Sequence, residues 1–181
     1  FSESGIEVTY KFLIRVHTLC VDAREFVSTD SSKNHYAENR LYTAIRDITE
    51  DLSSIKINTA VIKLMELTNY IYENRHALSV KMYHDCCNTL ALLINPFAPH
   101  LSEECYHLLG NKEFASVAVW PVHDPAKINP ELAYREQLVE NTIKDIRAVL
   151  ELAKITTPHK ITLIIAEPWK YDLCTKIKEF N

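Results

Sequence analysis

Glycine is almost absent from this sequence, with only two among 181 residues. So few glycines argue against a fold rich in strands and tight turns, and against a glycine-rich loop that binds phosphate. Hydrophobic residues make up 47% of the chain and charged residues 24%, which is typical of a globular protein. The composition therefore favours long helices, in a chain long enough for one large core or for a core with a small appended unit.

Paired cysteines and long apolar runs are also lacking. The five cysteines include no CxxC pair and are odd in number, so we expect reduced, mostly buried thiols rather than a disulfide framework or a zinc site. No apolar run approaches the roughly 18 residues of a membrane span, and the first residues have no signal-peptide pattern. The sequence therefore predicts a cytoplasmic protein without a membrane segment. Because the chain begins at Phe1 rather than Met, we also expect it to be part of a longer protein.

A strong positive charge is missing as well, because the net charge is −4. This balance is not that of a typical nucleic-acid-binding protein. Any such role must rest on a local basic patch, or on another domain of the parent protein.

Apolar residues recur at steps of three and four along the first two thirds of the chain, the spacing of amphipathic helices. The first stripe predicts a helix that ends near Ser28. Short loops between such helices predict antiparallel neighbours, and so an up-and-down helical bundle over residues 1–121. The first stripe contains Phe12, Val16, Leu19, Ala23 and Phe26, and the four further helices are expected at about 34–54, 57–72, 78–94 and 99–109.

The last third of the chain has a different character. An extended segment is expected at 116–121, followed by a proline-containing linker at 122–130. Residues 131–181 predict the start of a small α/β domain with the order helix, strand, helix. The strand is expected at 161–165, where short, apolar and β-branched residues follow one another. The last helix is expected to place Trp169, Leu173, Ile177 and Phe180 on one face.

The stretch from 88 to 110 predicts two helices joined by a corner. Pro96 ends the first helix, because proline lacks an amide hydrogen and its ring clashes with the preceding turn. Pro99 suits the first turn of the second helix, and Gly110 suits its C-terminal stop. Glu103 and Glu104 are expected near the positive end of that helix. The residues expected to form this structural corner are Pro96, Phe97, Pro99, His100, Glu103 and Glu104.

Metal binding and catalysis find little support in the sequence. His100, Glu104 and His107 share one side of the helix after the corner, but the spacing is not that of HExxH, and we favour a solvated face without a metal. The adjacent Cys86 and Cys87 are more typical of packing. No residue has the local setting of an activated nucleophile, so we predict no catalytic residue in this chain.

Contact with a polynucleotide is the stronger hypothesis. Lysine and arginine neutralise phosphates, and tyrosine offers a stacking face for an unpaired base. On the third helix, three such residues recur every seven positions on the flank away from the apolar stripe. The alternative is that all these are ordinary solvated charges. The candidate contacts are Lys11, Arg15, Arg40, Arg46, Lys56, Lys63 and Tyr70.

Several segments carry a family resemblance. The PFAPHLSEE element at 96–104 resembles an element of the helical anticodon-binding domain of class Ia aminoacyl-tRNA synthetases. The helix INTAVIKLMELTN at 57–69 is similar to one in the leucyl-tRNA synthetases. The VWP segment at 119–121 with Asp124 resembles the segment that follows the bundle in the same family. The expected helix at 143–155, the expected strand and the EPWK at 167–170 resemble the archaeal and eukaryotic branch of that family.

This resemblance implies a leucine–tRNA ligase as the parent protein, with ATP and Mg as its cofactors and none in this part. The chain lacks the HIGH-like and KMSKS-like signatures of the catalytic domain. The implied partners are tRNA(Leu) and the catalytic and editing domains of the same chain. The implied role is docking on the backbone and shape of the tRNA. On this basis we expect Lys63→Ala or Arg40→Ala to weaken tRNA binding and to reduce its salt dependence.

Two alternatives stay open at this point. The parent could be another class Ia synthetase, for valine, isoleucine or methionine, because those enzymes share the PFAPHLSEE-type element. A helical protein-interaction module without RNA affinity is the alternative from a different class.

Overall fold

The computed structural model describes residues 3–167 and 169–170 of the chain. These residues fall into two compact units, divided between Gln137 and Leu138. They contain helices and short 3₁₀ turns, and no strand occurs among them. The prediction of a mainly helical fold is confirmed.

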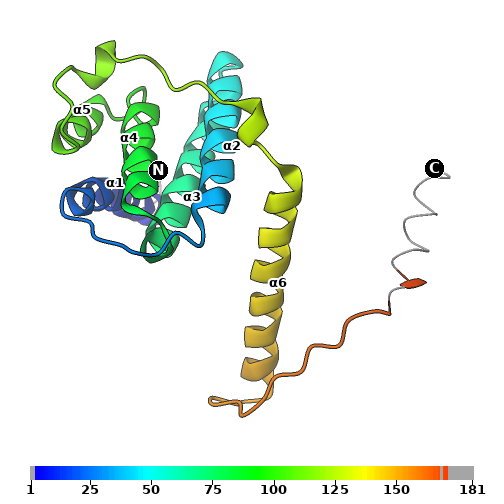
Figure 1. Cartoon of the computed structure of the whole chain (residues 1–181). Coiled ribbons are helices and arrows are strands. Elements are labelled where there is room, and N and C mark those ends of the chain that lie inside the picture. The colour runs from blue at the N-terminus through cyan, green and yellow to red at the C-terminus, as the bar shows by residue number, and fades with distance from the viewer. Residues whose placement is uncertain (1–2, 168, 171–181) are drawn as a thin grey trace. The chain divides into compact units, whose positions relative to one another are not determined.

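The first unit is a helical bundle (Figure 1). α2 packs along α3, and α1 packs on α4 and α5. The sixth helix, α6, begins in this unit and continues into the second one. The helices are α1 Glu3–Ala23, α2 Asn34–Ser53, α3 Ile57–Asn74, α4 Val80–Leu93, α5 Pro99–Leu108 and α6 Pro130–Leu152, with 3₁₀ turns η1 Arg75–Ala77, η2 Ala115–Val117 and η3 Pro125–Lys127.

Tyr83 of α4 is the largest fully buried side chain in the core. Its hydroxyl donates to the Leu19 carbonyl at 3.1 Å, so the one polar atom of the ring is satisfied. Phe26 lies with its ring centroid 4.2 Å from that of Tyr83. Full burial of a large apolar side chain contributes about 1.5–3 kcal/mol, so this contact ties the chain after α1 firmly to α4.

The first helix ends earlier than predicted, at Ala23 rather than near Ser28. Two turn hydrogen bonds, from Arg24 N to Val21 O and from Glu25 N to Asp22 O, close it. Phe26 fits the apolar periodicity of α1, but it lies in the loop after the helix, where its ring folds back onto the core. Periodicity alone could not distinguish this loop residue from a helical one.

The predicted signal at the start of α5 is confirmed, because Pro99 occupies its first turn. At the start of α4, the Ser79 hydroxyl accepts from the Met82 amide and caps the helix, a cap that is not among the predictions from the sequence. Gly110 has a φ of 88° and lies in a Schellman motif, where its amide donates to the His107 carbonyl and the next amide to that of Tyr106. The same motif closes α2 and α6 with non-glycine residues, Ile55 at φ 57° and Lys154 at φ 55°.

The predicted corner between α4 and α5 is held by Ser102, which is fully buried. Its hydroxyl donates to the Ala91 carbonyl at 2.7 Å and accepts from Nδ2 of the Asn95 side chain at 3.0 Å. The expected dipole role of Glu103 and Glu104 is wrong, because the first turn of α5 has no acidic residue and the dipole effect fades beyond that turn.

Glu103 instead holds the segment after α5. Its two carboxylate oxygens accept from the Ala115 and Ser116 amides at 2.7 and 3.0 Å. Burial opposes ionisation of Glu103, but these bonds outweigh it and lower the pKa of the carboxyl. η2 forms at this point, so the extended segment predicted at 116–121 begins with a 3₁₀ turn.

The second unit contains the rest of α6 and the chain that follows it. The strand predicted at 161–165 is wrong, because these residues are not in a strand, and a strand exists only where a second backbone pairs with it. Ile164 is 95% exposed and Ile165 is 78% exposed. The predicted last helix lies almost entirely outside the described residues. No helix in the described part is both long and apolar enough to span a bilayer.

Candidate nucleic-acid interface

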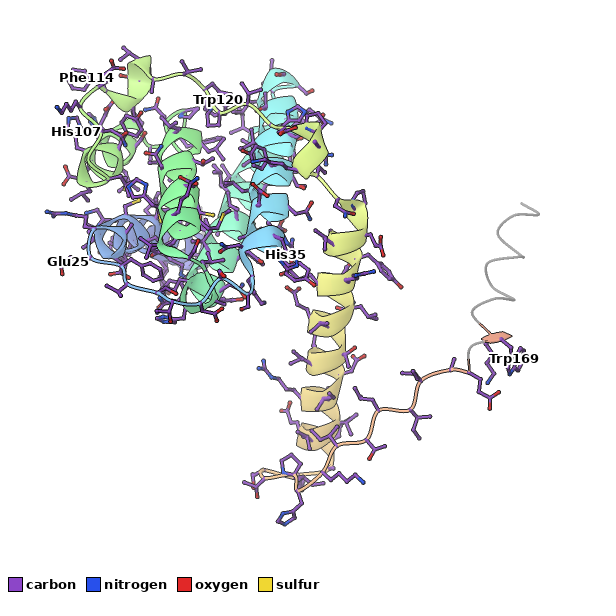
Figure 2. The ribbon with its side chains drawn as sticks, in the orientation of Figure 1. Glu25, His35, His107, Phe114, Trp120 and Trp169 are labelled. Carbon is purple, nitrogen blue, oxygen red and sulfur yellow. The ribbon has the colours of Figure 1, made fainter. Side chains whose placement is uncertain are left out.

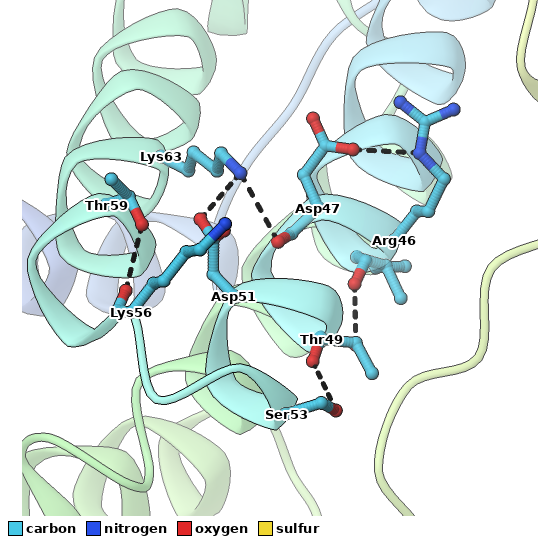
Figure 3. Close-up of polar contacts among 9 residues, drawn as sticks. Arg46, Asp47, Thr49, Asp51, Ser53, Lys56, Thr59 and Lys63 are labelled. Carbon is cyan, nitrogen blue, oxygen red and sulfur yellow. Dashed lines mark hydrogen bonds and ion pairs between the residues drawn. The ribbon is translucent and has the colours of Figure 1, made fainter.

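The predicted flank of α3 faces α2 (Figure 3). The Lys63 ammonium lies 2.6 Å from Oδ2 of Asp51, a carboxylate that is only 8% exposed. It also donates to the Asp47 carbonyl at 3.4 Å. The nearby Lys63 ammonium lowers the pKa of the Asp51 carboxyl. The Lys63 side chain is therefore half-buried and already forms an ion pair with Asp51.

Lys56 begins the same flank and is exposed. Its side chain points toward Asp51 (Figure 3), and its charge also lowers the pKa of that carboxyl. Its ammonium has no ion-pair partner in the part of the chain that the structure describes. The structure thus brings two predicted contacts, Lys56 and Lys63, to one carboxylate at the α2–α3 turn.

The placement predicted for Tyr70, away from the core, is wrong. Its ring is only 7% exposed, because this flank of α3 faces α2 and the first turns of α6. The Arg40 guanidinium lies over the ring at 5.4 Å from its centroid. Burial, and then the charge of Glu136, raise the pKa of the Tyr70 hydroxyl. A base cannot stack on this ring without displacing the chain around it.

Arg40 holds the beginning of α6 to the bundle. Its Nε donates to Oε2 of Glu136 at 3.1 Å, and the Glu136 side chain is 6% exposed while that of Arg40 is 37% exposed. Oε1 of Glu136 and the Tyr70 hydroxyl are both buried and have no hydrogen bond. We call Arg40, Tyr70 and Glu136 the buried anchor.

The segment before α6 is fixed along α2 by further polar contacts. The buried Asn39 side chain accepts from the Asn129 amide at 2.6 Å. Lys127 bonds to Glu38 at 2.7 Å, and this hydrogen bond raises the pKa of Lys127 to about 12. The Trp120 indole N–H donates to the Thr49 hydroxyl at 2.9 Å, and Figure 2 shows where Trp120 lies in the bundle. These contacts cover one face of α2 with protein.

Lys11 and Arg46 each have a carboxylate partner on their own helix. Lys11 bonds to Glu7 at 2.6 Å, and Arg46 to Asp47 at 2.8 Å. Exposed pairs of this kind contribute only about 0–1 kcal/mol to stability, so the cations can exchange partners. A phosphate must nevertheless compete with the carboxylate for them.

Arg15 has a different setting. It donates to the Asn69 side chain and lies over the Tyr72 ring, 4.9 Å from the centroid. Arg75 lies over the same ring at 4.3 Å and donates to the Tyr72 carbonyl. We call Arg15, Asn69, Tyr72 and Arg75 the arginine–tyrosine cluster.

Arg75 and Tyr72 were missed as candidate contacts in the sequence. Tyr72 belonged to the apolar stripe of α3 and was counted as core, whereas it is only half-buried. The available signal was an arginine three residues after a tyrosine, a spacing that brings two side chains together on a helix. Arg15 comes from α1 and joins them only through the tertiary packing of α1 on α3.

The structure brings no metal-binding set together in its described part. His100 and Glu104 are exposed, and Nδ1 of His107 is 3.1 Å from the Glu103 carbonyl of its own helix. The His107 ring meets Phe114 edge-on at 6.1 Å (Figure 2). The predicted buried thiols are confirmed for Cys20, Cys86, Cys87 and Cys105, while Cys174 lies outside the described residues.

Residues 34–165 match the family model of the anticodon-binding domain of tRNA ligase. The leucine–tRNA ligase of Methanocaldococcus jannaschii is 28% identical over 180 residues, which cover 96% of this chain and 19% of the relative. The leucine–tRNA ligase of a Nostoc species is 34% identical over 138 residues, which cover 71% of this chain and 16% of the relative. The chain thus spans less than a fifth of the length of these relatives.

A solved structure has a similar fold. It is the ternary complex of the Agrobacterium radiobacter K84 LeuRS with tRNA and LeuAMS, with a TM-score of 0.63 and 25% sequence identity. The match covers 71% of this chain and 18% of that one. The resemblance noted in the sequence, to the leucine members of the class, is confirmed by the relatives and by this structure.

Proposed function

Since the chain belongs to the family of anticodon-binding domains of tRNA ligases, we propose that it is the tRNA-docking part of a leucine–tRNA ligase. One observation supports this most directly: the similar solved structure is a LeuRS in complex with tRNA. The leucine–tRNA ligases among the relatives favour leucine over valine, isoleucine or methionine. They also disfavour a protein-interaction module without RNA affinity.

The proposed role is to bind tRNA(Leu) by its backbone and shape. Contacts to phosphate and sugar fix orientation without reading sequence. The predicted contacts Lys11, Arg15, Arg46, Lys56 and Lys63 remain the proposed ones. Most of them would exchange a carboxylate for a phosphate, which fits a net charge of −4 and a moderate affinity.

The chemistry would take place in another part of the parent protein. Leucylation would use ATP and Mg there, and this chain offers no group of ligands for a metal in its described residues. Docking a tRNA at a distance helps to hold its reacting end in place, and such positioning can contribute strongly to rate. This chain is therefore proposed to position the substrate rather than to transform it.

The catalytic and editing domains of the same parent are the other proposed partners. Helix α1 leaves large apolar side chains exposed, namely Ile6, Val8, Tyr10 and Ile14, each at 48% or more. We also propose the predicted domain division, a bundle over 1–121, a linker over 122–130 and a C-terminal part over 131–181. A cytoplasmic location belongs to the same proposal, supported by four buried free thiols.

Binding of tRNA(Leu) to the 181-residue chain tests the proposal. Fluorescence anisotropy over a salt titration should show tighter binding to tRNA(Leu) than to an unstructured RNA of equal length, with affinity falling as salt rises. Lys56→Ala should weaken binding without a loss of stability, because Lys56 is exposed. Lys63→Ala should weaken binding too, but it also leaves Asp51 buried without its cation. Equal binding to both RNAs would overturn the proposal.

A further inference from the structure

We infer that the arginine–tyrosine cluster is a binding site for backbone phosphate of RNA, on a surface formed by α1, α3 and η1. The inference rests on the proposed function and goes beyond the contacts that the sequence predicts. It assigns a role to Arg75 and Tyr72, and it joins Arg15 to them in one site.

Within the described residues, Arg15 and Arg75 form no ion pair with a carboxylate, unlike several other cations of the bundle. Within the described part of the chain, carboxylates pair with Arg40, Arg46 and Arg135, as they do with Lys63 and Lys127. The printed hydrogen bonds of Arg15 and Arg75 instead go to neutral groups, the Asn69 side chain and the Tyr72 carbonyl. A phosphate at an unpaired guanidinium gains attraction without first displacing a carboxylate.

The positive charges of Arg15 and Arg75 lie around one aromatic ring. The guanidinium carbons of Arg15 and Arg75 lie 4.9 and 4.3 Å from the centroid of Tyr72. Two positive charges around one ring repel each other in the free protein, and an anion bound near them reduces that repulsion. Before an anion binds, cation–π contact with the ring partly offsets this repulsion.

Both arginine side chains are restricted before any ligand binds. Each contacts the Tyr72 ring, Arg15 also donates to the Asn69 side chain, and Arg75 also donates to the Tyr72 carbonyl. Less conformational entropy is then lost on binding. Each guanidinium has five N–H donors, and their planar fork matches phosphate oxygens.

The neighbourhood of Arg75 has room for a ligand. A hollow of about 490 Å³ lies beside it, lined by Arg24 and His76 as well as by the acidic Asp22 and Glu25. The Tyr72 ring is half-buried and both guanidinium groups lie against it, so the site presents two positive charges to RNA. The site would therefore hold backbone rather than a base, without reading sequence.

Three arginine substitutions test this inference in the full chain. Arg15→Ala and Arg75→Ala should each weaken tRNA(Leu) binding about tenfold, as expected for one charge-assisted contact, and should reduce the slope of log K against log salt by about one. Arg135→Ala is the matched control. It also removes one arginine, but that side chain is 63% exposed and already paired with Glu131, so affinity and slope should stay as in the wild type.

Two conservative variants distinguish loss of the binding site from loss of the folded structure. Arg15→Lys keeps the charge but loses the planar fork, and it should recover only part of the affinity. Tyr72→Phe keeps the ring and should bind as the wild type does, even if an alanine variant proves unstable.

The outcomes are distinct. If Arg135→Ala lowers affinity as much as Arg15→Ala, only overall charge matters and the inferred site is wrong, while tRNA docking stands. Unchanged tRNA binding in both Arg15→Ala and Arg75→Ala would likewise show that the inferred site is wrong, while tRNA docking stands. Equally tight, equally Arg15-dependent binding of polyglutamate would indicate a site for acidic peptides instead. If the wild-type chain binds no tRNA, the proposed function fails together with the site.

Discussion

Ile55 occupies the position after α2 that Gly110 occupies after α5. Both have positive φ angles, 57° and 88°. A residue with a β-carbon is destabilised by about 1–2 kcal/mol in this left-handed region, and isoleucine is β-branched. Burial does not compensate, because Ile55 is 82% exposed. The conformation is held by the Schellman motif, in which the Lys56 amide donates to the Asp51 carbonyl at 2.7 Å.

Replacing Ile55 with glycine should therefore stabilise the protein. We expect Ile55→Gly to raise the free energy of unfolding by about 1 kcal/mol, because the strain disappears and little packing is lost. Urea denaturation followed by circular dichroism measures this. Gly110→Ala is the counterpart, and it should lower the same quantity by about 1 kcal/mol, since an added β-carbon meets no atom there and only φ matters. A less stable Ile55→Gly protein would contradict the argument.

Glu136 in the buried anchor offers a second prediction at this scale. Glu136→Gln keeps the shape but removes the charge that faces Arg40, and it should lower the free energy of unfolding by about 1–3 kcal/mol. Comparing tRNA binding by Glu136→Gln and by Arg40→Ala distinguishes a structural role of Arg40 from a direct contact with tRNA. If Arg40 is mainly structural, Arg40→Ala and Glu136→Gln should reduce stability alike and affect tRNA binding little once the proteins are folded. A large loss of affinity in Arg40→Ala alone would instead show that Arg40 contacts tRNA directly.

Between elements, the α2–α3 pair depends on a carboxylate with a lowered pKa. Lys63 stabilises the charged form of Asp51 in the folded protein. The ion pair therefore contributes stability above the ordinary aspartate pKa of about 3.9. That contribution is lost as the pH falls through the lower folded-state value. Glu103, whose pKa is also lowered by the amides of η2, acts in the same direction.

Asp51→Asn should remove this pH dependence from the α2–α3 pair. The difference in free energy of unfolding between wild type and Asp51→Asn should be constant from pH 8 to about pH 5, and it should shrink below about pH 4. Denaturation curves at several pH values measure it. A difference that grows on acidification would show that Asp51 is not stabilised by Lys63.

The elements themselves could be predicted from local pattern. The helices around the corner, Ser79 to Gly110, follow from apolar spacing, prolines and a C-terminal glycine. The direction in which a polar flank points could not be predicted in the same way. Tyr70 and Lys63 fall off the apolar stripe of α3, yet they face α2, because a helix inside a bundle has neighbours on more than one side. The pairing of Arg15 with Arg75 across two helices likewise has no local signal.

At the scale of the whole molecule, the two units differ in what holds their backbone. Amides in the bundle lie in helices around a buried core that includes Leu64 and Ile71. Between Ile155 and Glu167 no described amide donates a backbone hydrogen bond. The strand expected at 161–165 could not be judged from its own residues, because pairing depends on a partner that its sequence does not reveal.

Hydrogen–deuterium exchange measures this contrast. Amides of residues 157–166 should exchange at nearly the rate of an unstructured peptide, whereas those around Leu64 should be protected to the level of global unfolding. Strong protection at 161–165 would show that these residues pair with another backbone in solution.

The docking of Trp120 on α2 provides an optical reporter inside the bundle. The chain has two tryptophans: the indole of Trp120 is half-buried and bonded to Thr49, whereas Trp169 is 56% exposed. In a Trp169→Phe variant, all indole emission would come from Trp120. A red shift of that emission would then report, in real time, when the segment after α5 leaves α2.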